Sequence, residues 1–187
     1  DQRENRSLLE RYAKGRSVLN MFCYTGGFSV YAMRGDAKLV HSVDSSAKAI
    51  DLTNKNIELN FPGDTRHAAY AEDAFKYLDR MGDQYDLIIL DPPAFTKSRK
   101  TVGSAERGYK EINYRAMRLL PRGGYLATCS CSHFMENRLF VKMVMSAAKD
   151  AGVQLKLIEA RQQAPDHPIL LNVPETDYLK FYLFQVV

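Results

Sequence analysis

Short apolar runs alternate along this chain with longer segments in which apolar residues recur every three or four positions. The short runs are typical of buried strands, and the longer segments have the spacing of amphipathic helices. The expected strands are Ser17–Met21, Lys38–Val43, His67–Ala71, Tyr85–Leu90, Gly124–Cys129, Gln154–Glu159 and Lys180–Val187. The expected helices are Gly27–Arg34, Ser46–Asn60, Ala74–Gly82, Tyr109–Leu120 and Met135–Ala151.

This alternation predicts an α/β fold with a mostly parallel seven-stranded sheet and helices on both faces. The pattern changes near the end, because residues 162–176 contain three prolines and no clear period. A loop rather than a helix then leads into the final strand. A strand that returns without a crossover helix is expected to be antiparallel.

Composition fits one globular domain, with 187 residues of which 45% are hydrophobic and 26% charged. No apolar run approaches the roughly 20 residues that span a bilayer, and the start of the chain lacks a secretory signal pattern. We therefore expect a cytoplasmic protein without membrane contact. Because the chain begins with Asp1 rather than methionine, we expect residues 1–187 to be a domain from a longer protein.

The turn after the first strand has the sequence LNMFCYTGGFS at Leu19–Ser29. Gly26 and Gly27 allow a ligand to approach the backbone closely at the start of a helix. The turn lacks the G-x-G-x-x-G spacing of a pyrophosphate cradle, which favours a nucleoside ligand without phosphates. S-adenosylmethionine is such a ligand, and we expect it to contact this turn. The remaining candidate contacts in the turn are Phe22, Tyr24 and Thr25.

Acidic residues end the next two strands. Asp44, followed by Ser45, has the placement of a carboxylate that accepts both ribose hydroxyls. Asp73 and Ala74 come at the end of the third strand, where the carboxylate or the backbone can contact an adenine edge. Taken alone, a glycine turn is often only a turn and such an aspartate is often a helix cap. Three such features in strand order favour a cofactor site.

Two further motifs follow the fourth and fifth strands. LDPPAFTKS at Leu90–Ser98 places Asp91 where a buried strand ends and two prolines fix the loop. ATCSCSH at Ala127–His133 places Cys131 just after the next expected strand. Chemistry gathers at the carboxyl ends of strands in open α/β sheets, so these motifs are expected to face each other.

Three cysteines, two of them one residue apart, suit reduced thiols better than disulfides. Cys23 and Cys129 are expected to be buried. The spacing Cys129, Cys131, His133 would allow a zinc site, but no second paired motif completes it. We therefore expect no metal.

Positive charge is concentrated in residues 97–122, where eight basic residues stand against two acidic ones, a net charge of +6. The rest of the chain sums to −2, within a total of +4. This stretch directly follows the Asp91 loop, as expected if a polyanion approaches there. A solvated loop and helix face would explain it equally well.

The combined motifs resemble the class I S-adenosylmethionine-dependent methyltransferases. More narrowly, the chain is similar to bacterial large-subunit ribosomal RNA (cytosine-5)-methyltransferases that carry an N-terminal RNA-binding PUA domain, which is absent here. The segments that carry this resemblance are DQREN at Asp1–Asn5, FCYTGGFSVYA at Phe22–Ala32, RGYKEIN at Arg107–Asn113, SCS at Ser130–Ser132 and DHP at Asp166–Pro168.

The resemblance implies a Rossmann-like fold, S-adenosylmethionine as cofactor and ribosomal RNA as partner. It assigns the nucleophile to Cys131, which would add to carbon 6 of cytosine and make carbon 5 reactive. Asp91 would then hydrogen-bond the pyrimidine near nitrogen 3 and stabilise the developing charge. Further expected substrate contacts are Pro92, Pro93, Phe95, Arg107 and Lys110, the last two holding phosphate or lowering the thiol pKa.

Two other functions remain open on the sequence. Methylation of a guanine or adenine nitrogen uses a similar loop, in which an aromatic residue often directly follows the double proline. Here Ala94 takes that position and Phe95 comes one residue later. A cofactor-binding or RNA-binding module without catalysis is the second alternative, against which the intact Asp91 and Cys131 argue.

Overall fold

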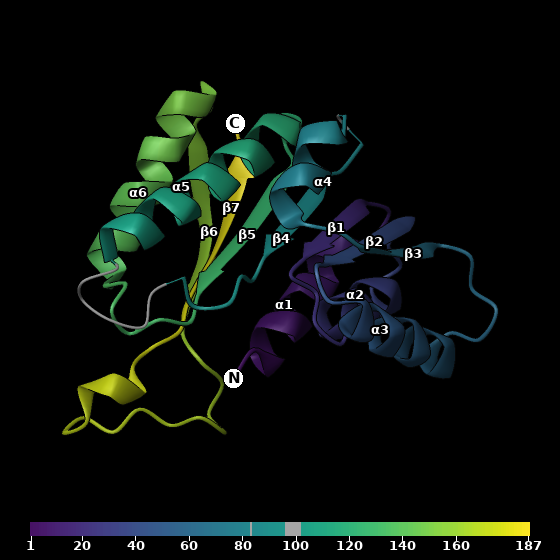
Figure 1. The fold of residues 1–187 in the computed structure, drawn as a ribbon, viewed down its shortest axis with the longest axis horizontal. Helices are drawn as coiled ribbons and strands as arrows, with labels where there is room; N and C mark the ends of the chain where they lie inside the picture. The colour runs from purple at the N-terminus through teal and green to yellow at the C-terminus, as the bar shows by residue number, and fades with distance from the viewer. Residues whose placement is uncertain (83, 96–101) are drawn as a thin grey trace.

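The computed structural model describes residues 1–82, 84–95 and 102–187, which form one seven-stranded sheet with helices on both faces (Figure 1). The strand order is β3-β2-β1-β4-β5-β7-β6, and β7 is antiparallel to both of its neighbours. The predicted fold class and the antiparallel final strand are therefore confirmed. The strands are β1 Ser17–Met21, β2 Leu39–Asp44, β3 His67–Ala71, β4 Leu87–Leu90, β5 Tyr125–Ser130, β6 Leu155–Arg161 and β7 Lys180–Val186.

The helices cover the sheet in two groups of three. One face carries α1, α2 and α3, and the other carries α4, α5 and α6 (Figure 1). Their bounds are α1 Arg3–Ala13, α2 Gly27–Arg34, α3 Ala47–Asn60, α4 Ala74–Arg80, α5 Val102–Leu119 and α6 Asn137–Ala151. Within the described residues, none of these helices is long and apolar enough to cross a membrane.

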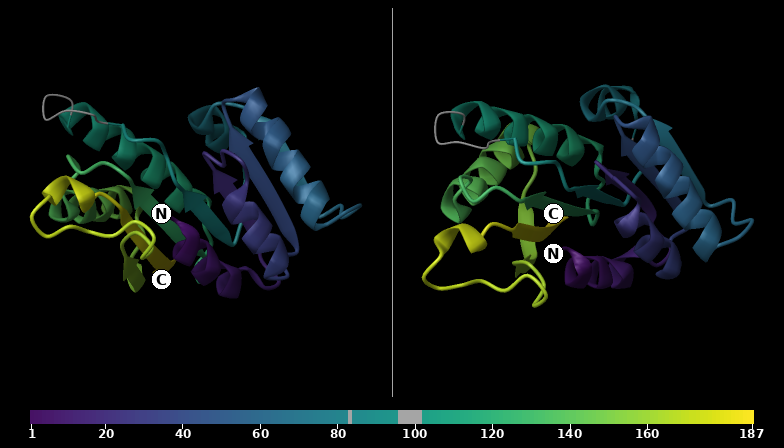
Figure 2. Two further views of the ribbon diagram at one scale, coloured as in Figure 1. Left: turned by 90° about the horizontal axis from the view of Figure 1, so that it is seen from below. Right: turned by 60° about the horizontal axis from the view of Figure 1, so that its bottom comes forward.

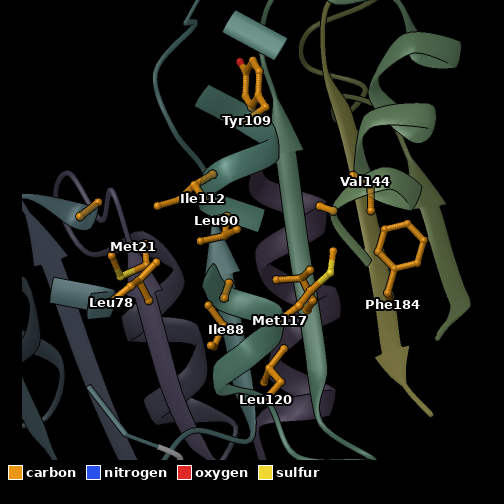
Figure 3. Close-up of a cluster of buried hydrophobic side chains, with 14 of the residues drawn as sticks. Met21, Leu78, Ile88, Leu90, Tyr109, Ile112, Met117, Leu120, Val144 and Phe184 are labelled. Atoms are coloured by element: carbon orange, nitrogen blue, oxygen red, sulfur yellow. The ribbon is translucent and has the colours of Figure 1, made fainter. Parts of the chain in front are cut away.

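Both faces of the central strands are buried, as strand β4 illustrates. Ile88 and Leu90 point into the core beneath α4, α5 and α6 (Figure 3). Leu87 and Ile89 point into the opposite core beneath α1 and α2. Successive side chains of a strand alternate between the faces of a sheet, so an uninterrupted apolar run is what a sheet covered on both sides requires.

The largest difference from the predicted elements is helix α1, which was not among the expected helices. Its apolar side chains are few, but the buried residues Asn5, Leu8, Leu9 and Ala13 recur with helical spacing. Leu8, Leu9 and Ala13 pack into the core beneath α2. The two helices approach so closely that a Cβ atom at Gly35 would collide with the carbonyl oxygen of Glu10. This contact holds the second half of α1 against the end of α2.

Helix α5 begins at Val102 rather than at the predicted Tyr109. The glycines at 103 and 108 favoured a loop, because glycine is a poor residue in a helix interior. The structure gives Gly108 a packing role, since a Cβ atom there would lie 3.3 Å from the Phe95 ring. Close packing against Phe95 thus explains why a glycine stands at position 108 inside this helix.

The segment between β6 and β7 extends beyond the sheet beside the start of α1 (Figures 1 and 2). It contains a single turn of 3-10 helix, η2 Pro174–Thr176, within the loop that the prolines predicted. The backbone N–H of Ala164 donates to the carbonyl oxygen of Asp1. The hydroxyl of Tyr178 donates to the Asp1 carboxylate. Because β7 is antiparallel, its first residue, Lys180, lies at the edge where β4 and β5 end.

Candidate functional site

The expected site residues gather at one edge of the sheet. Asp44 ends β2, and Asp73 follows β3 by two residues. Asp91 directly follows β4, and Cys131 directly follows β5. These four strands are parallel, so their carboxyl ends lie on the same side, as predicted for an open α/β sheet.

The turn after β1 has a strained backbone. Phe22 and Tyr24 have φ angles of 57° and 51°, a region that non-glycine residues seldom occupy. The surrounding structure holds them there, because the N–H of Tyr24 donates to Asp44 Oδ2 over 3.0 Å and Thr53 donates to the Tyr24 carbonyl over 2.9 Å. Asn56 similarly donates to the carbonyl of Thr25. Such strain is common where a loop must fit a ligand.

The two glycines of this turn differ in what surrounds them. Gly26 has a φ of 78°, and a Cβ atom there would lie 2.7 Å from the methyl group of Thr53. Backbone conformation and packing therefore explain Gly26. A Cβ atom at Gly27 would lie 2.9 Å from the guanidinium carbon of Arg6, a flexible side chain that can move, so close approach of a ligand stays a prediction for Gly27.

The Asp44 carboxylate forms hydrogen bonds to the turn after β1 and to the residue before α3. Its oxygens accept from the N–H groups of Tyr24 and Ser46, over 3.0 and 2.9 Å. Each carboxylate oxygen has a further lone pair, so these bonds leave acceptor capacity for ribose hydroxyls. Ser45 is exposed beside it. Ser46 caps helix α3 by accepting from the N–H of Ala49, which matches the helix start expected from the sequence.

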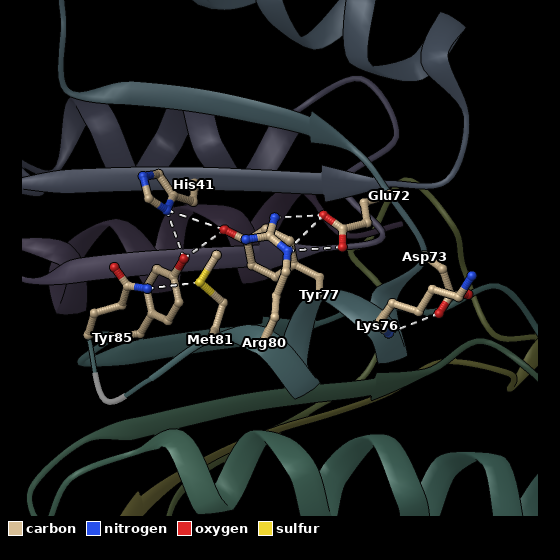
Figure 4. A network of polar contacts seen from close by, with 9 residues as sticks. His41, Glu72, Asp73, Lys76, Tyr77, Arg80, Met81 and Tyr85 are labelled. Carbon is tan, nitrogen blue, oxygen red and sulfur yellow. Dashed lines mark hydrogen bonds and ion pairs between the residues drawn. The ribbon is translucent and has the colours of Figure 1, made fainter.

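Asp73 acts as the N-cap of α4 (Figure 4). Its Oδ1 accepts from the N–H groups of Phe75 and Lys76, over 3.1 and 3.0 Å. Asp73 therefore serves as a helix cap, which is the second role that the sequence allowed for it. The side chain of Ala74 is buried in the core, so only its backbone is available to a ligand.

A polar network behind Asp73 fixes α4 against β2 (Figure 4). The Tyr85 hydroxyl lies 2.7 Å from His41 Nδ1 and 2.8 Å from the Tyr77 hydroxyl. Burial lowers the pKa of His41 and raises the pKa of Tyr85. These groups are therefore neutral at pH 7. Arg80 covers the network and pairs with Glu72.

Asp91 is held by helix α1. Gln2 donates to Asp91 Oδ1 over 3.0 Å, and Asn5 donates in turn to Gln2 Oε1 over 2.8 Å. Burial raises the pKa of Asp91 to about 6, although the Gln2 hydrogen bond and the charge of Arg6 act in the opposite direction. The carboxyl group can therefore be protonated near neutral pH, a property that the sequence pattern did not indicate.

The double proline and the residues after it frame this carboxyl group. Pro92 is buried and Pro93 is exposed. The Phe95 ring lies against Tyr109, with 4.6 Å between ring centroids, and edge-on to Phe22 at 6.3 Å. Much of the surface of the Phe95 ring is therefore covered by other side chains of the protein.

Cys131 is the accessible thiol of the three. Cys129 is fully buried and Cys23 is 6% exposed, as expected, whereas Cys131 is half-buried. Its Sγ lies 4.0 Å from the carbonyl oxygen of Pro92, so the thiol faces the Asp91 loop. Burial and the negative charge of Asp91 raise the pKa of Cys131, while Lys180 acts to lower it.

Within the described part of the basic stretch, Arg107 and Lys110 are not the cations that act on the Cys131 thiol, which differs from the expectation from sequence. Lys110 Nζ lies 2.6 Å from Asp150 on α6. Lys110 and Arg107 line a groove of about 420 Å³ together with Glu111, Tyr114 and Asp150, over α5 and α6. Among the described residues, Lys180 on β7 is the cation that acts on the thiol. The expected cations Lys97, Arg99 and Lys100 lie outside the described residues.

Arg6 is a second residue that the sequence pattern missed. Its guanidinium group lies 5.8 Å from the Phe28 ring centroid and against Gly27, at the start of α2. Its Nε is buried and has no hydrogen-bond partner in the described part of the chain. A cation at the positive end of a helix is unfavourable unless an anion lies there too. The residues present therefore fit a ligand with a carboxylate.

A cavity of about 850 Å³ adjoins the Cys131 loop on the side of β7. Its wall is formed by α1, the residues after β5 and the segment between β6 and β7, including Asn5, His133, Gln163, Leu171 and Lys180. Within the described ranges, no group of three His, Cys, Asp or Glu side chains is arranged to hold a metal ion.

Comparison with known proteins gives consistent results. A family model for S-adenosylmethionine-dependent methyltransferases matches residues 1–185. Ribosomal RNA large subunit methyltransferase I of Aeromonas hydrophila is 48% identical over 183 residues, which cover 96% of this chain and 46% of that protein. The protein of the same name from Erwinia tasmaniensis is 45% identical over 190 residues, with coverages of 100% and 48%. The chain thus spans about half the length of these curated relatives.

A solved structure also resembles the chain over its full length. The crystal structure of SMU.776, described as a methyltransferase complexed with SAH, has a TM-score of 0.87 at 26% sequence identity. The match covers 100% of this chain and 49% of that protein. The element order and the sheet topology described above are therefore shared with a methyltransferase of known structure.

Proposed function

Because the chain belongs to the family of S-adenosylmethionine-dependent methyltransferases, we propose that it methylates carbon 5 of a cytosine in large-subunit ribosomal RNA. The observation that carries this proposal is the position of Cys131, the accessible thiol, facing the Asp91 loop at the carboxyl edge of the sheet. The names of the curated relatives support ribosomal RNA as the substrate class. Nitrogen methylation has no need of this thiol.

The cofactor site extends along the ends of β1, β2 and β3. S-adenosylmethionine bound there supplies an electrophilic methyl group. Arg6 and the start of α2 receive the methionine carboxylate, since the buried Nε of Arg6 has no hydrogen-bond partner among the described residues. Asp44 receives the ribose hydroxyls, and the backbone around Asp73 and Ala74 borders the adenine.

The acceptor base lies between Asp91 and Cys131. The Cys131 thiolate adds to carbon 6, and the electron pair of the 5,6 double bond moves towards nitrogen 3 and leaves carbon 5 nucleophilic. A protonated Asp91 donates a hydrogen bond at nitrogen 3 and stabilises this charge. Its pKa of about 6 makes this form accessible. Gln2 keeps the carboxyl group oriented through its hydrogen bond.

The adduct then resolves by elimination. After carbon 5 has gained the methyl group, its proton passes to water and the electron pair of that C–H bond forms the 5,6 double bond. The carbon–sulfur bond breaks in the same step, and its electron pair returns to the Cys131 thiolate. Arg107 is exposed on α5 and is the proposed phosphate contact together with Lys110. Pro93 is exposed and borders the base.

The proposed function is tested by identifying the product. The protein is incubated with S-adenosylmethionine carrying a labelled methyl group and with ribosomal RNA that lacks the modification, and the nucleosides are analysed by mass spectrometry. The expected labelled product is 5-methylcytidine. Label on a guanine or adenine nitrogen would overturn the proposal, and cofactor binding without transfer to any RNA would favour a non-catalytic module.

Substitution of Arg6 tests the cofactor site independently of RNA. Arg6→Gln is expected to weaken binding of S-adenosylhomocysteine about tenfold, because one charge-assisted contact to the carboxylate is lost. Isothermal titration calorimetry measures the dissociation constant. Arg3→Gln is the matched control, because Arg3 is exposed on the same helix and pairs with Glu4 and Asp166. Equal affinities of the two variants would show that Arg6 does not contact the cofactor.

A further inference from the structure

Lys180 is a buried cation immediately behind the Cys131 loop. In the antiparallel pairing of β5 and β7 it lies opposite Ser130, the residue before Cys131. Its side chain is folded inward and the residue is only 7% exposed. The ammonium group donates to the carbonyl oxygens of Ser132 and Tyr178, over 2.5 and 2.7 Å. It therefore fixes the backbone on the far side of Cys131.

Burial of this charge needs a compensating partner. Removing an ammonium group from water is costly, and neutral carbonyl groups offset only part of that cost. Burial lowers the pKa of Lys180 to about 8, while Asp177 and Cys131 act to raise it. At neutral pH the group is still mainly protonated. The electrostatic partners of the buried ammonium thus include the thiol.

The other ionisable groups that act on Cys131 are anionic or neutral. Asp91, after β4, raises the pKa of the thiol through its negative charge. Tyr109 on α5 has a raised pKa and is neutral at pH 7. The same holds for Cys129 on β5 and Tyr178 before β7. Among the residues that the structure describes, Asp91 is the anion that opposes ionisation of the thiol and Lys180 is the cation that favours it.

We propose that Lys180 is the positioning residue of this site: it holds the Cys131–Ser132 turn through the Ser132 carbonyl and provides the positive charge that stabilises the Cys131 thiolate. The thiol proton passes to water, and the ammonium group remains protonated. This role rests on the proposed use of Cys131 as the nucleophile. The ionisation of the thiol, however, can be measured without RNA or cofactor.

The test follows alkylation of each cysteine by iodoacetamide across pH 6 to 10, with peptides quantified by mass spectrometry. The thiolate displaces iodide, so the rate at each pH reports the ionised fraction. Lys180→Met removes the charge and keeps the length of the side chain. It is expected to slow alkylation of Cys131 at pH 7 about tenfold. The difference is expected to shrink above about pH 8, where Lys180 itself loses its proton. Lys180→Arg keeps the charge and is expected to retain most of the rate.

Lys38→Met is the matched control, because Lys38 is a cation that pairs with Asp86, before the start of β4 and away from Cys131. Its alkylation profile is expected to match that of the unaltered protein. A Lys180→Met protein that folds normally, with Cys23 and Cys129 still protected, but has an unchanged Cys131 profile would overturn the proposal. A shifted profile together with a labelled product other than 5-methylcytidine would refute the proposed function and leave the role of Lys180 intact.

A reciprocal measurement applies if the Lys180 variants do not fold. Coupling between two ionisable groups is the same from either side. Cys131→Ala is therefore expected to lower the pKa of Lys180, which is measured from the pH dependence of acetylation of its amine by acetic anhydride. An unchanged profile in this variant would overturn the proposal.

Discussion

Replacing Cys131 with alanine is expected to abolish formation of 5-methylcytidine, with a loss of at least roughly a thousandfold in rate. Carbon 5 of cytosine is a poor nucleophile, and without the thiolate no adduct forms to activate it. The measurement is transfer of labelled methyl groups to RNA in single-turnover conditions. Binding of S-adenosylhomocysteine is expected to be unchanged, because the proposed cofactor contacts are Arg6, the start of α2 and the residues at the ends of β1, β2 and β3.

Cys129→Ala is the matched control for this prediction. Cys129 is two residues away and fully buried, so its removal leaves a small cavity that costs about 1 kcal/mol and keeps the Cys131 thiol in place. RNA containing 5-fluorocytosine provides a positive test, because fluorine at carbon 5 blocks the final elimination and traps the protein on RNA through Cys131. Retained methylation by Cys131→Ala would exclude the covalent route.

Replacing Asp91 with asparagine is expected to lower the rate of methyl transfer by about a hundredfold, because an amide can donate a hydrogen bond at nitrogen 3 but cannot stabilise the charge by giving up a proton. The same change is expected to make the folded protein more stable at pH 8. The Gln2 hydrogen bond is kept, since asparagine retains the accepting oxygen. Asp91→Ala loses both interactions and is expected to be the slower of the two variants.

The stability effect follows from the pKa of Asp91. The ordinary value of 3.8 rises to about 6 in the folded protein, so the folded state holds its proton more tightly than the unfolded state. Stability from this group is fully present below about pH 4 and is lost as pH rises through about 6. The free energy of unfolding falls by up to about 3 kcal/mol over this pH range. The partial exposure of Asp91 reduces this to about 1 to 2 kcal/mol.

Asp91→Asn avoids this loss. Its melting temperature is expected to exceed that of the unaltered protein by a few degrees at pH 8 and by less at pH 5. Thermal unfolding at both pH values measures the difference. Asp86→Asn is a comparison at the other end of β4, since Asp86 accepts from the N–H of Ser17 and pairs with Lys38. A stability gain for Asp91→Asn that does not grow with pH would contradict the prediction.

Elements with strong local patterns were predicted well from sequence. The bounds of β1, β3 and α2 agree with the expected ranges, and the proline-rich segment before β7 is a loop. Helix α1 was missed although its buried residues Asn5, Leu8, Leu9 and Ala13 recur with helical spacing, and its close packing against Gly35 became visible only in the fold. The sequence pattern of one segment does not show which surface of another segment it packs against.

The sequence by itself determined the order of the strands and of helices α2 to α6, and it predicted the edge of the sheet at which Asp91 and Cys131 lie. Those features follow from local periodicity and from motifs within single turns of chain. Only the tertiary structure decided which groups act on that pair. Gln2 reaches Asp91 from 89 residues away, and Lys180 reaches the Cys131 turn from 48 residues away. The burial of a site and the charges around it depend on residues that come together only when the chain folds. The spacing of residues along the chain does not show which residues these are.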